Sequence, residues 1–288
     1  MEYAYYPGCS LQATARSYDE SLRKVFSLLD LRLHEIPDWN CCGATMYMSV
    51  DQVLASCLSA RTLALAERLG LDIVAPCSSC FTILNKTRTL LEVNEELARC
   101  VAEALEPSDL RTTGASRVRH PLEVLINDVG IEAIAARRRR DLAGTRVAPY
   151  YGCQIVRQEE PFDDRQHPTT MDRLFEALGA SSVPFPMKVR CCGGMLMTTA
   201  PEVGERLAGE ILAAARAEAS ACIVTTCPLC QINLEAYQKR VAPGAPPVPV
   251  LFFTQLLGLA LGAEPSELGL HRQIVPFALA EEHATLHL

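Results

Sequence analysis

The sequence has little positive charge and no long apolar run. Its 27 lysines and arginines stand against 34 aspartates and glutamates, and the net charge of −7 argues against a nucleic-acid backbone as the main partner. The most apolar window, residues 248–263, includes Thr254 and Gln255 and is shorter than the about 18 residues that a membrane-spanning helix needs. We therefore expect no membrane span, and a buried helix in this window.

Sequence signals of several other protein classes are also missing. The N-terminal MEYAYYPGCS lacks the basic stretch followed by an apolar stretch that is typical of a secretion signal, so we expect a cytoplasmic protein. There is no G-x-G-x-x-G at the start of a helix and no P-loop, so we expect no flavin or nucleotide on this chain. The compact cysteine run of a ferredoxin is absent as well.

Cysteine, in contrast, is abundant, with 13 in 288 residues. Thiols stay reduced in the cytoplasm, so an odd number of cysteines indicates metal ligation or redox chemistry rather than structural disulfides. Ten of them form two copies of one pattern, in which a single cysteine is followed by an adjacent pair with a glycine and then by C-x-x-C. The first copy is Cys9, Cys41, Cys42, Cys77 and Cys80, and the second is Cys153, Cys191, Cys192, Cys227 and Cys230.

The two copies match in spacing and in context. In both, 34 residues separate the adjacent pair from the C-x-x-C, and the first cysteine ends a tyrosine-rich segment, YYPGC or PYYGC. An insertion in the second copy, which we place in the segment 158–170, accounts for the one difference in spacing. The chain is therefore a tandem duplication.

Each copy predicts an α/β unit. Short apolar runs at 71–75 and 221–226 precede the two C-x-x-C motifs and are typical of buried strands. Helices are predicted after Asp51 as N-cap, from Pro201, and after each C-x-x-C. We predict two tandem repeats, each a small Rossmann-like parallel sheet with helices, related by internal pseudo-symmetry and carrying their cysteine loops at one edge. The predicted parts are an N-terminal domain at 1–106, a helical linker at 107–145 and a C-terminal domain at 146–288.

Five cysteines per copy exceed the four ligands of a zinc ion. Adjacent cysteines have Cα atoms about 3.8 Å apart, so both sulfurs can reach neighbouring irons of one polynuclear cluster. The pattern therefore favours an iron–sulfur cluster in each copy, with a zinc-binding scaffold as the alternative.

The remaining notable residues have simpler interpretations. Three cysteines lie outside the repeat and are expected to be buried thiols without a redox role: Cys57, Cys100 and Cys222. Four methionines follow the adjacent pairs and either shield the clusters from water or simply pack in the core: Met46, Met48, Met195 and Met197. The basic run from Arg137 to Arg140 indicates a solvated helix end, with a docking patch for an acidic partner as the second interpretation.

The two motifs, C-x31-CC-G-x33-C-x-x-C and C-x37-CC-G-x33-C-x-x-C, resemble the cysteine-rich CCG domain in duplicate. The chain resembles the B subunit of heterodisulfide reductase across nearly its whole length, including the segments at 120–125, 150–153 and 249–258. The resemblance implies that each set of five cysteines holds a non-cubane [4Fe–4S] cluster, the first on Cys9, Cys41, Cys42, Cys77 and Cys80 and the second on Cys153, Cys191, Cys192, Cys227 and Cys230. It also implies that disulfide chemistry occurs between the two clusters.

The resemblance further implies partners and a substrate class. The chain would be the catalytic iron–sulfur subunit of a complex with a ferredoxin-like C subunit and a flavin-bearing A subunit. Its substrate would be the mixed disulfide of coenzyme M and coenzyme B, or sulfane sulfur on a lipoate-binding protein in sulfur-oxidising bacteria. Arginine in place of lysine and a high alanine content favour the bacterial branch. The alternative is a CCG-type electron-transfer module without a substrate of its own.

Overall fold

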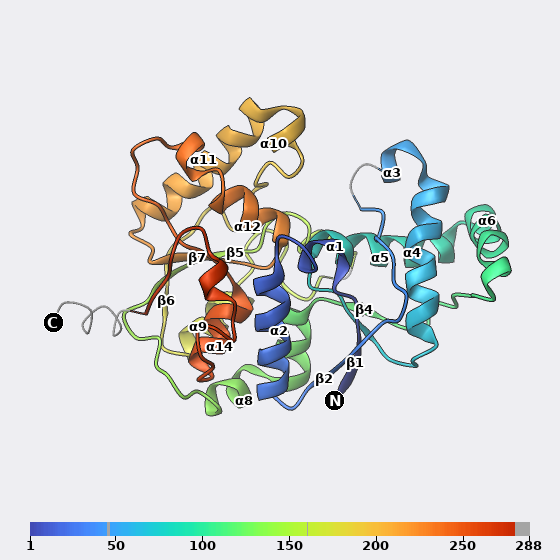
Figure 1. Cartoon of the computed structure of the whole chain (residues 1–288), viewed down its shortest axis with the longest axis horizontal. Coiled ribbons are helices and arrows are strands. Elements are labelled where there is room, and N and C mark those ends of the chain that lie inside the picture. The colour runs from blue at the N-terminus through green and yellow to red at the C-terminus, as the bar shows by residue number, and fades with distance from the viewer. Residues whose placement is uncertain (45–46, 160, 280–288) are drawn as a thin grey trace.

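The fold is built from two parallel sheets with the same strand order. We describe a computed structural model of the chain for residues 1–44, 47–159 and 161–279. The first sheet has the order β2-β1-β3-β4 and the second has the order β6-β5-β7-β8, and every strand pair in both is parallel (Figure 1). The predicted fold class, two pseudo-symmetric α/β repeats with parallel sheets, is confirmed.

The strands are short, and only part of them could be recognised in the sequence. The apolar runs before each C-x-x-C form β3 and β7, as predicted. The edge strands β2 and β6 are polar and largely exposed, so they carry no apolar signal. The bounds are β1 (Glu2–Tyr5), β2 (Arg32–Glu35), β3 (Ile73–Val74), β4 (Val118–Arg119), β5 (Arg146–Tyr150), β6 (Ser181–Ser182), β7 (Cys222–Thr225) and β8 (Val250–Phe252).

Helices cover the sheets. The helix starts predicted at Asp51 and Pro201 are confirmed, whereas the helices predicted after each C-x-x-C begin inside the motif, at Ser78 and Pro228. The Asp51 side chain accepts a hydrogen bond of 2.9 Å from the Leu54 N–H and caps one long helix, and Pro201 opens its counterpart. The longer helices are α2 (Arg16–Leu28), α4 (Gln52–Glu67), α5 (Ser78–Val93), α6 (Glu95–Leu105), α9 (Thr170–Ala177), α11 (Pro201–Ala217), α12 (Pro228–Glu235) and α14 (Phe253–Ala260). Shorter ones are α1 (Gly8–Leu11), α3 (Tyr47–Val50), α7 (Pro121–Val124), α8 (Ile131–Ala136), α10 (Leu196–Thr199) and α13 (Gln238–Val241).

The apolar window at 248–263 contains the predicted buried helix, but only in its second part, so our expectation was wrong for the first part. Its first part forms β8, which pairs with β7, and the helix α14 begins only at Phe253. The Gln255 side chain accepts a hydrogen bond from the Phe252 N–H at this junction. A buried strand and a buried helix are equally apolar, so hydropathy could not separate them.

The segment 107–145 contributes to the first sheet. It contains β4, which pairs with β3, as well as α7, a π-helical turn at Leu125–Val129, and α8. Because β8 occupies the matching place in the second sheet, β4 belongs to the repeat itself. The division of the chain at residues 106 and 145 remains a prediction.

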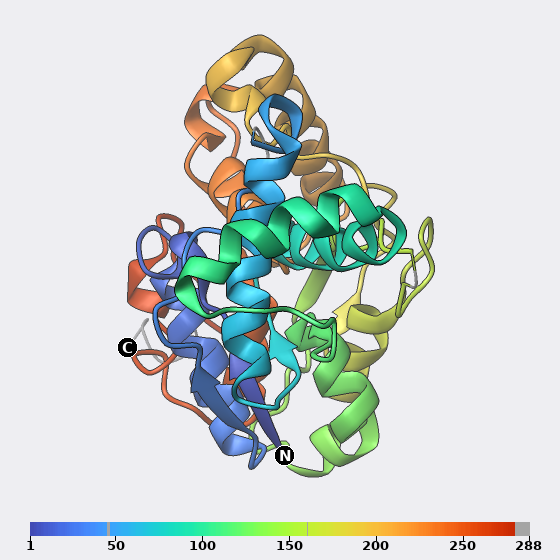
Figure 2. The ribbon, with the colours of Figure 1, turned by 90° about the vertical axis from the view of Figure 1, so that its right-hand side faces the viewer.

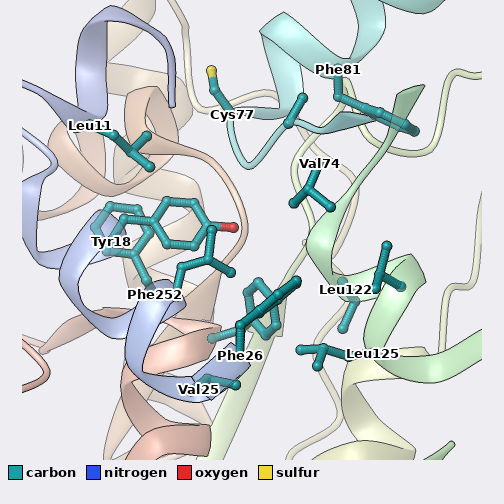
Figure 3. Packing of buried hydrophobic residues seen from close by; sticks show 14 of the residues in the cluster. Leu11, Tyr18, Val25, Phe26, Val74, Cys77, Phe81, Leu122, Leu125 and Phe252 are labelled. Atoms are coloured by element: carbon teal, nitrogen blue, oxygen red, sulfur yellow. The ribbon is translucent and has the colours of Figure 1, made fainter. Parts of the chain in front are cut away.

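One of the two hydrophobic cores of the described chain contains residues of both repeats, and the other lies within the second repeat. Helix α2 of the first repeat packs against α14 of the second, and the Tyr18 ring stacks on the Phe252 ring with centroids 4.3 Å apart (Figure 3). The buried hydroxyls of Ser21 and Thr254 are hydrogen-bonded at 2.6 Å in the same contact. Buried packing of this kind holds the two repeats in one relative position.

The basic run that follows α8 is engaged within the chain. Arg137 pairs with Asp30 at 2.7 Å, Arg138 with Asp141 at 3.3 Å and Arg140 with Glu264 at 2.8 Å. The backbone N–H groups of Arg139 and Arg140 both donate to the Ala260 carbonyl. These contacts favour the solvated helix end over the docking patch, because three of the four guanidinium groups already have carboxylate partners on this chain.

Candidate functional site

All ten repeat cysteines lie at the carboxyl edges of the two sheets. In the first repeat, Cys9 follows β1, the adjacent pair follows β2, and the C-x-x-C spans the start of α5 after β3. The second repeat places its cysteines in the same way after β5, β6 and β7. The helices α3 and α10, which follow the adjacent pairs, lie at the end of the molecule opposite the N-terminus in both views (Figures 1 and 2).

The structure brings the five cysteines of each repeat together. In the first set the Sγ atoms of Cys42 and Cys80 are 3.2 Å apart. Cys41 lies close enough to shift the pKa of Cys42, and Cys77 close enough to shift that of Cys80. In the second set Cys191 lies close enough to shift the pKa of Cys153, and Cys192 and Cys227 close enough to shift that of Cys230. The inner cysteines are buried in both sets, whereas the outer ones have some exposure: Cys9, Cys41, Cys153 and Cys191.

Contacts among these thiols favour the ionised form at some positions and oppose it at others. Hydrogen bonds from Cys41 and Cys80 lower the pKa of Cys42 to about 4, and a hydrogen bond from Cys153 lowers the pKa of Cys191 to about 6. The pKa of Cys80 is raised well above its usual range by its hydrogen bonds to neighbouring thiols, with burial acting in the same direction. Full ionisation of five crowded thiols therefore requires a compensating positive charge, such as a metal centre supplies.

Glycines allow the backbone to approach the buried sulfurs. Gly8 and Gly152, each next to the first cysteine of its set, have positive φ angles of 68° and 71°. A Cβ atom at Gly8 would lie 3.3 Å from the Cys80 Sγ, and one at Gly152 would lie 2.9 Å from the Cys230 Sγ. At both positions the absence of a side chain leaves a space next to the buried sulfur, which we call the glycine cradle. Any larger side chain would fill this space.

A tyrosine in each repeat supports the loop of the adjacent pair. The Tyr6 hydroxyl donates to the Asn40 carbonyl at 2.8 Å, and the Tyr150 hydroxyl donates to the Arg190 carbonyl at 2.7 Å. In both repeats the acceptor residue directly precedes the cysteine pair. Burial, together with nearby thiols, raises the pKa of both tyrosines, which keeps them protonated as donors. Our reading of the sequence assigns these tyrosines no role, although the shared YYPGC and PYYGC segments carry the signal.

The two sets face each other. The thiols of Cys77 and Cys227, the first cysteines of the two C-x-x-C motifs, lie close enough to shift each other's pKa, that of Cys77 upward and that of Cys227 downward. Beside them, the Ser78 hydroxyl lies 3.3 Å from both the carbonyl and the hydroxyl oxygen of Thr226. The N-terminal ends of α5 and α12 therefore meet at the interface of the repeats.

A cavity of about 320 Å³ opens at the second set. Ser78 and Ser79 of the first repeat line it together with residues of the second, so both repeats contribute to its wall. The cysteines that line it are Cys153, Cys191, Cys192, Cys227 and Cys230. Among the described residues, no three His, Cys, Asp or Glu side chains are arranged to hold a single metal ion.

The other residues singled out in the sequence have different positions. Met195 lines the cavity and is 41% exposed, while Met197 is buried in the core of the second repeat. Met48 is half-buried, and Met46 lies outside the described residues. Cys222 is buried in β7, whereas the two other cysteines outside the repeat, Cys57 and Cys100, are only half-buried.

Comparisons with known proteins agree with the repeat. Residues 3–85 and 147–235 both match the family model described as a cysteine-rich domain, CCG. The 8-methylmenaquinol:fumarate reductase membrane anchor subunit of Wolinella succinogenes is 34% identical, with 95% of this chain and 97% of that protein covered. A protein of Archaeoglobus profundus, named as similar to the B subunit of heterodisulfide reductase, is 32% identical, with 93% of each chain covered.

A third relative and one solved structure extend this similarity. The B subunit of the ferredoxin/F(420)H(2)-dependent CoB-CoM heterodisulfide reductase of Methanosarcina acetivorans is 30% identical, with 93% of this chain and 92% of that protein covered. The crystal structure of a hypothetical protein from Helicobacter pylori shares the fold, with a TM-score of 0.80 at 14% identity over 96% of this chain. The chain spans about half, 52%, of that structure. In the described part of the chain, no helix has the length and apolar character to cross a membrane.

Proposed function

Since the chain belongs to the cysteine-rich CCG domain family, in which its relatives include the B subunit of heterodisulfide reductase, we propose that it is the catalytic iron–sulfur subunit of a heterodisulfide reductase-like complex. The observation that carries this proposal is the meeting of two complete five-cysteine sets at Cys77 and Cys227. A substrate between them would contact both sets at once. We propose a disulfide or a lipoate-bound sulfane sulfur as that substrate.

The residues present fit a polynuclear cluster in each repeat. Each set offers five thiols, mutual hydrogen bonds that favour some thiolates, and a glycine cradle next to a buried sulfur. The proposed ligands are Cys9, Cys41, Cys42, Cys77 and Cys80 for the first cluster and Cys153, Cys191, Cys192, Cys227 and Cys230 for the second. When bound, the two clusters would supply one electron each and iron positions for the two sulfurs of the substrate.

The chain's own residues then have three tasks. The cysteines act as ligands, so no side chain is needed as a nucleophile. Ser78, Ser79 and Leu229 line the cavity, where they position a substrate and displace water. The buried hydroxyls of Tyr6 and Tyr150 stay protonated and donate hydrogen bonds to the backbone carbonyls that precede the cysteine pairs, which keeps these loops in place.

Anaerobic purification is expected to yield about eight irons and about eight acid-labile sulfides per chain, because each five-cysteine set would hold one four-iron cluster. Metal and sulfide analysis of the brown protein, with protein concentration from amino-acid analysis, measures this. Near-zero iron together with about two zinc ions per chain would contradict the proposal and support the zinc-binding scaffold.

A second candidate function is electron transfer without a disulfide substrate. The similarity to a protein named as the membrane anchor subunit of a fumarate reductase favours it, because that name assigns no disulfide chemistry. Turnover separates the two functions. With reduced viologen as the electron donor, the catalytic subunit would consume the coenzyme M–coenzyme B disulfide or lipoamide, whereas an electron-transfer module would become reduced and release no thiols.

We expect the isolated chain to be inactive with NADH or NADPH and to gain activity with a ferredoxin-like C subunit or an artificial one-electron donor. The sequence has no nucleotide or flavin fingerprint, and we propose that a flavoprotein A subunit supplies that chemistry in the complex. Anaerobic oxidation of NADH or NADPH, followed spectroscopically with and without the partner, measures this. Oxidation by the single chain without added flavin would contradict the proposal.

A further inference from the structure

His120 lies between the two repeats, directly after β4. It is fully buried, and its Nδ1 accepts a hydrogen bond of 3.1 Å from the Leu122 N–H at the start of α7. The ring proton of the neutral imidazole therefore sits on Nε2. Burial lowers the pKa of His120 to about 4, so the ring is neutral at physiological pH.

The Nε2–H of His120 faces two carbonyl oxygens from different repeats. The Pro76 carbonyl lies 3.1 Å away and the Thr226 carbonyl lies 3.3 Å away. Pro76 directly precedes Cys77, and Thr226 directly precedes Cys227. One proton thus joins the backbone of the two C-x-x-C loops next to the point where their thiols meet.

The second repeat shows that its fold does not require this histidine. Val74 pairs with Arg119 in the first sheet, and Val224 pairs with Leu251 in the second, so Phe252 occupies the position of His120. Both residues precede the first residue of a helix, α7 or α14. Phe252 forms the same junction without a side-chain donor and stacks on Tyr18 instead. The histidine bridge is therefore an addition to the repeat, and it supplements the contact of Ser78 with Thr226 between the same loops.

We propose that His120 is a positioning residue that sets the separation of the two cysteine sets by tying the Pro76 and Thr226 carbonyls together. This rests on the proposed function, because the separation matters only if two clusters act on one substrate. In the absence of the donor, two buried carbonyls lose a hydrogen bond, and the loops can move apart. Displacements of this kind are costly where two centres must reach the same molecule.

The test compares two variants with the wild-type protein loaded with iron. His120→Phe introduces the residue of the second repeat and removes the donor, whereas His120→Gln retains an N–H donor at the end of its side chain. The main measurement is the magnetic interaction between the two reduced clusters, recorded by electron paramagnetic resonance, together with the iron content. We expect His120→Phe to keep its iron and to lose the resolved interaction, and His120→Gln to recover it.

Tyr18→Phe is the matched control. It removes another buried donor to the Thr226 carbonyl, at 3.3 Å, but this donor does not reach Pro76. We expect its interaction spectrum to equal that of the wild type. An unchanged spectrum in His120→Phe, an equal loss in Tyr18→Phe, or loss of iron in both His120 variants would each overturn the positioning role. Absence of iron from the wild-type protein would instead refute the proposed function.

Discussion

Replacing Cys192 with serine is expected to remove about half of the iron and to abolish disulfide turnover. Cys192 is buried, raises the pKa of the nearby Cys230, and accepts a hydrogen bond of 3.6 Å from the Asn233 amide nitrogen. A serine hydroxyl is a poor substitute for a thiolate that binds iron. Cys41→Ser should have the same effect on the first set, because the proposed two-electron reaction would need both clusters. Iron analysis and viologen-coupled turnover measure both outcomes.

Cys57→Ser is the control for these substitutions. Cys57 lies on α4, is half-buried, and belongs to neither five-cysteine set. Both the iron content and the turnover of this variant should equal those of the wild type. An equal loss in Cys57→Ser would show that the proposed ligand sets are wrong.

Gly152→Ala is expected to remove the iron of the second set while the first set keeps its own. The added Cβ would lie 2.9 Å from the Cys230 Sγ, and the backbone φ of 71° is one that alanine rarely adopts. Because the sulfur is buried, it cannot move away without leaving its place in the set. Iron analysis should therefore show about half of the wild-type iron, and turnover should be lost.

Gly144→Ala is the control that separates the two effects of Gly152→Ala, the crowding of the Cys230 sulfur and the strain of the backbone. Gly144 has a similar φ of 80°, but nothing lies within 4 Å of its added Cβ. We expect a decrease of about 1 kcal/mol in the free energy of unfolding and full iron content. Gly8→Ala should be intermediate, because its Cβ would lie 3.3 Å from the Cys80 Sγ. Equal iron content in Gly152→Ala and the wild type would show that the second set does not need the glycine cradle to bind iron.

The sequence was sufficient to predict the repeat and to group the cysteines, because the spacing of the cysteines is visible even where helix and strand cannot be distinguished. It was not sufficient for β2 and β6, whose residues are polar and whose pairing depends on a neighbouring strand. The apolar window at 248–263 concealed β8 for the opposite reason, since strand and helix there are both fully buried.

Contacts between the repeats were beyond reach of the sequence for a further reason. The meeting of Cys77 with Cys227, and of His120 with both C-x-x-C loops, depends on how two folded units pack. No periodicity or motif in either repeat encodes that contact. The histidine stands in a segment whose sequence indicates a linker, so its place between the two repeats emerges only from the structure.

The packing of α2 against α14 also constrains the order of events during biosynthesis. These helices come from opposite ends of the chain, so their contact closes a very long loop. A nascent chain still lacking residues 252–260 leaves the apolar side of α2 uncovered, and Tyr18 has no stacking partner. The first five-cysteine set is thus translated well before the core beside it is complete, and it reaches its final surroundings only after α14 has been made.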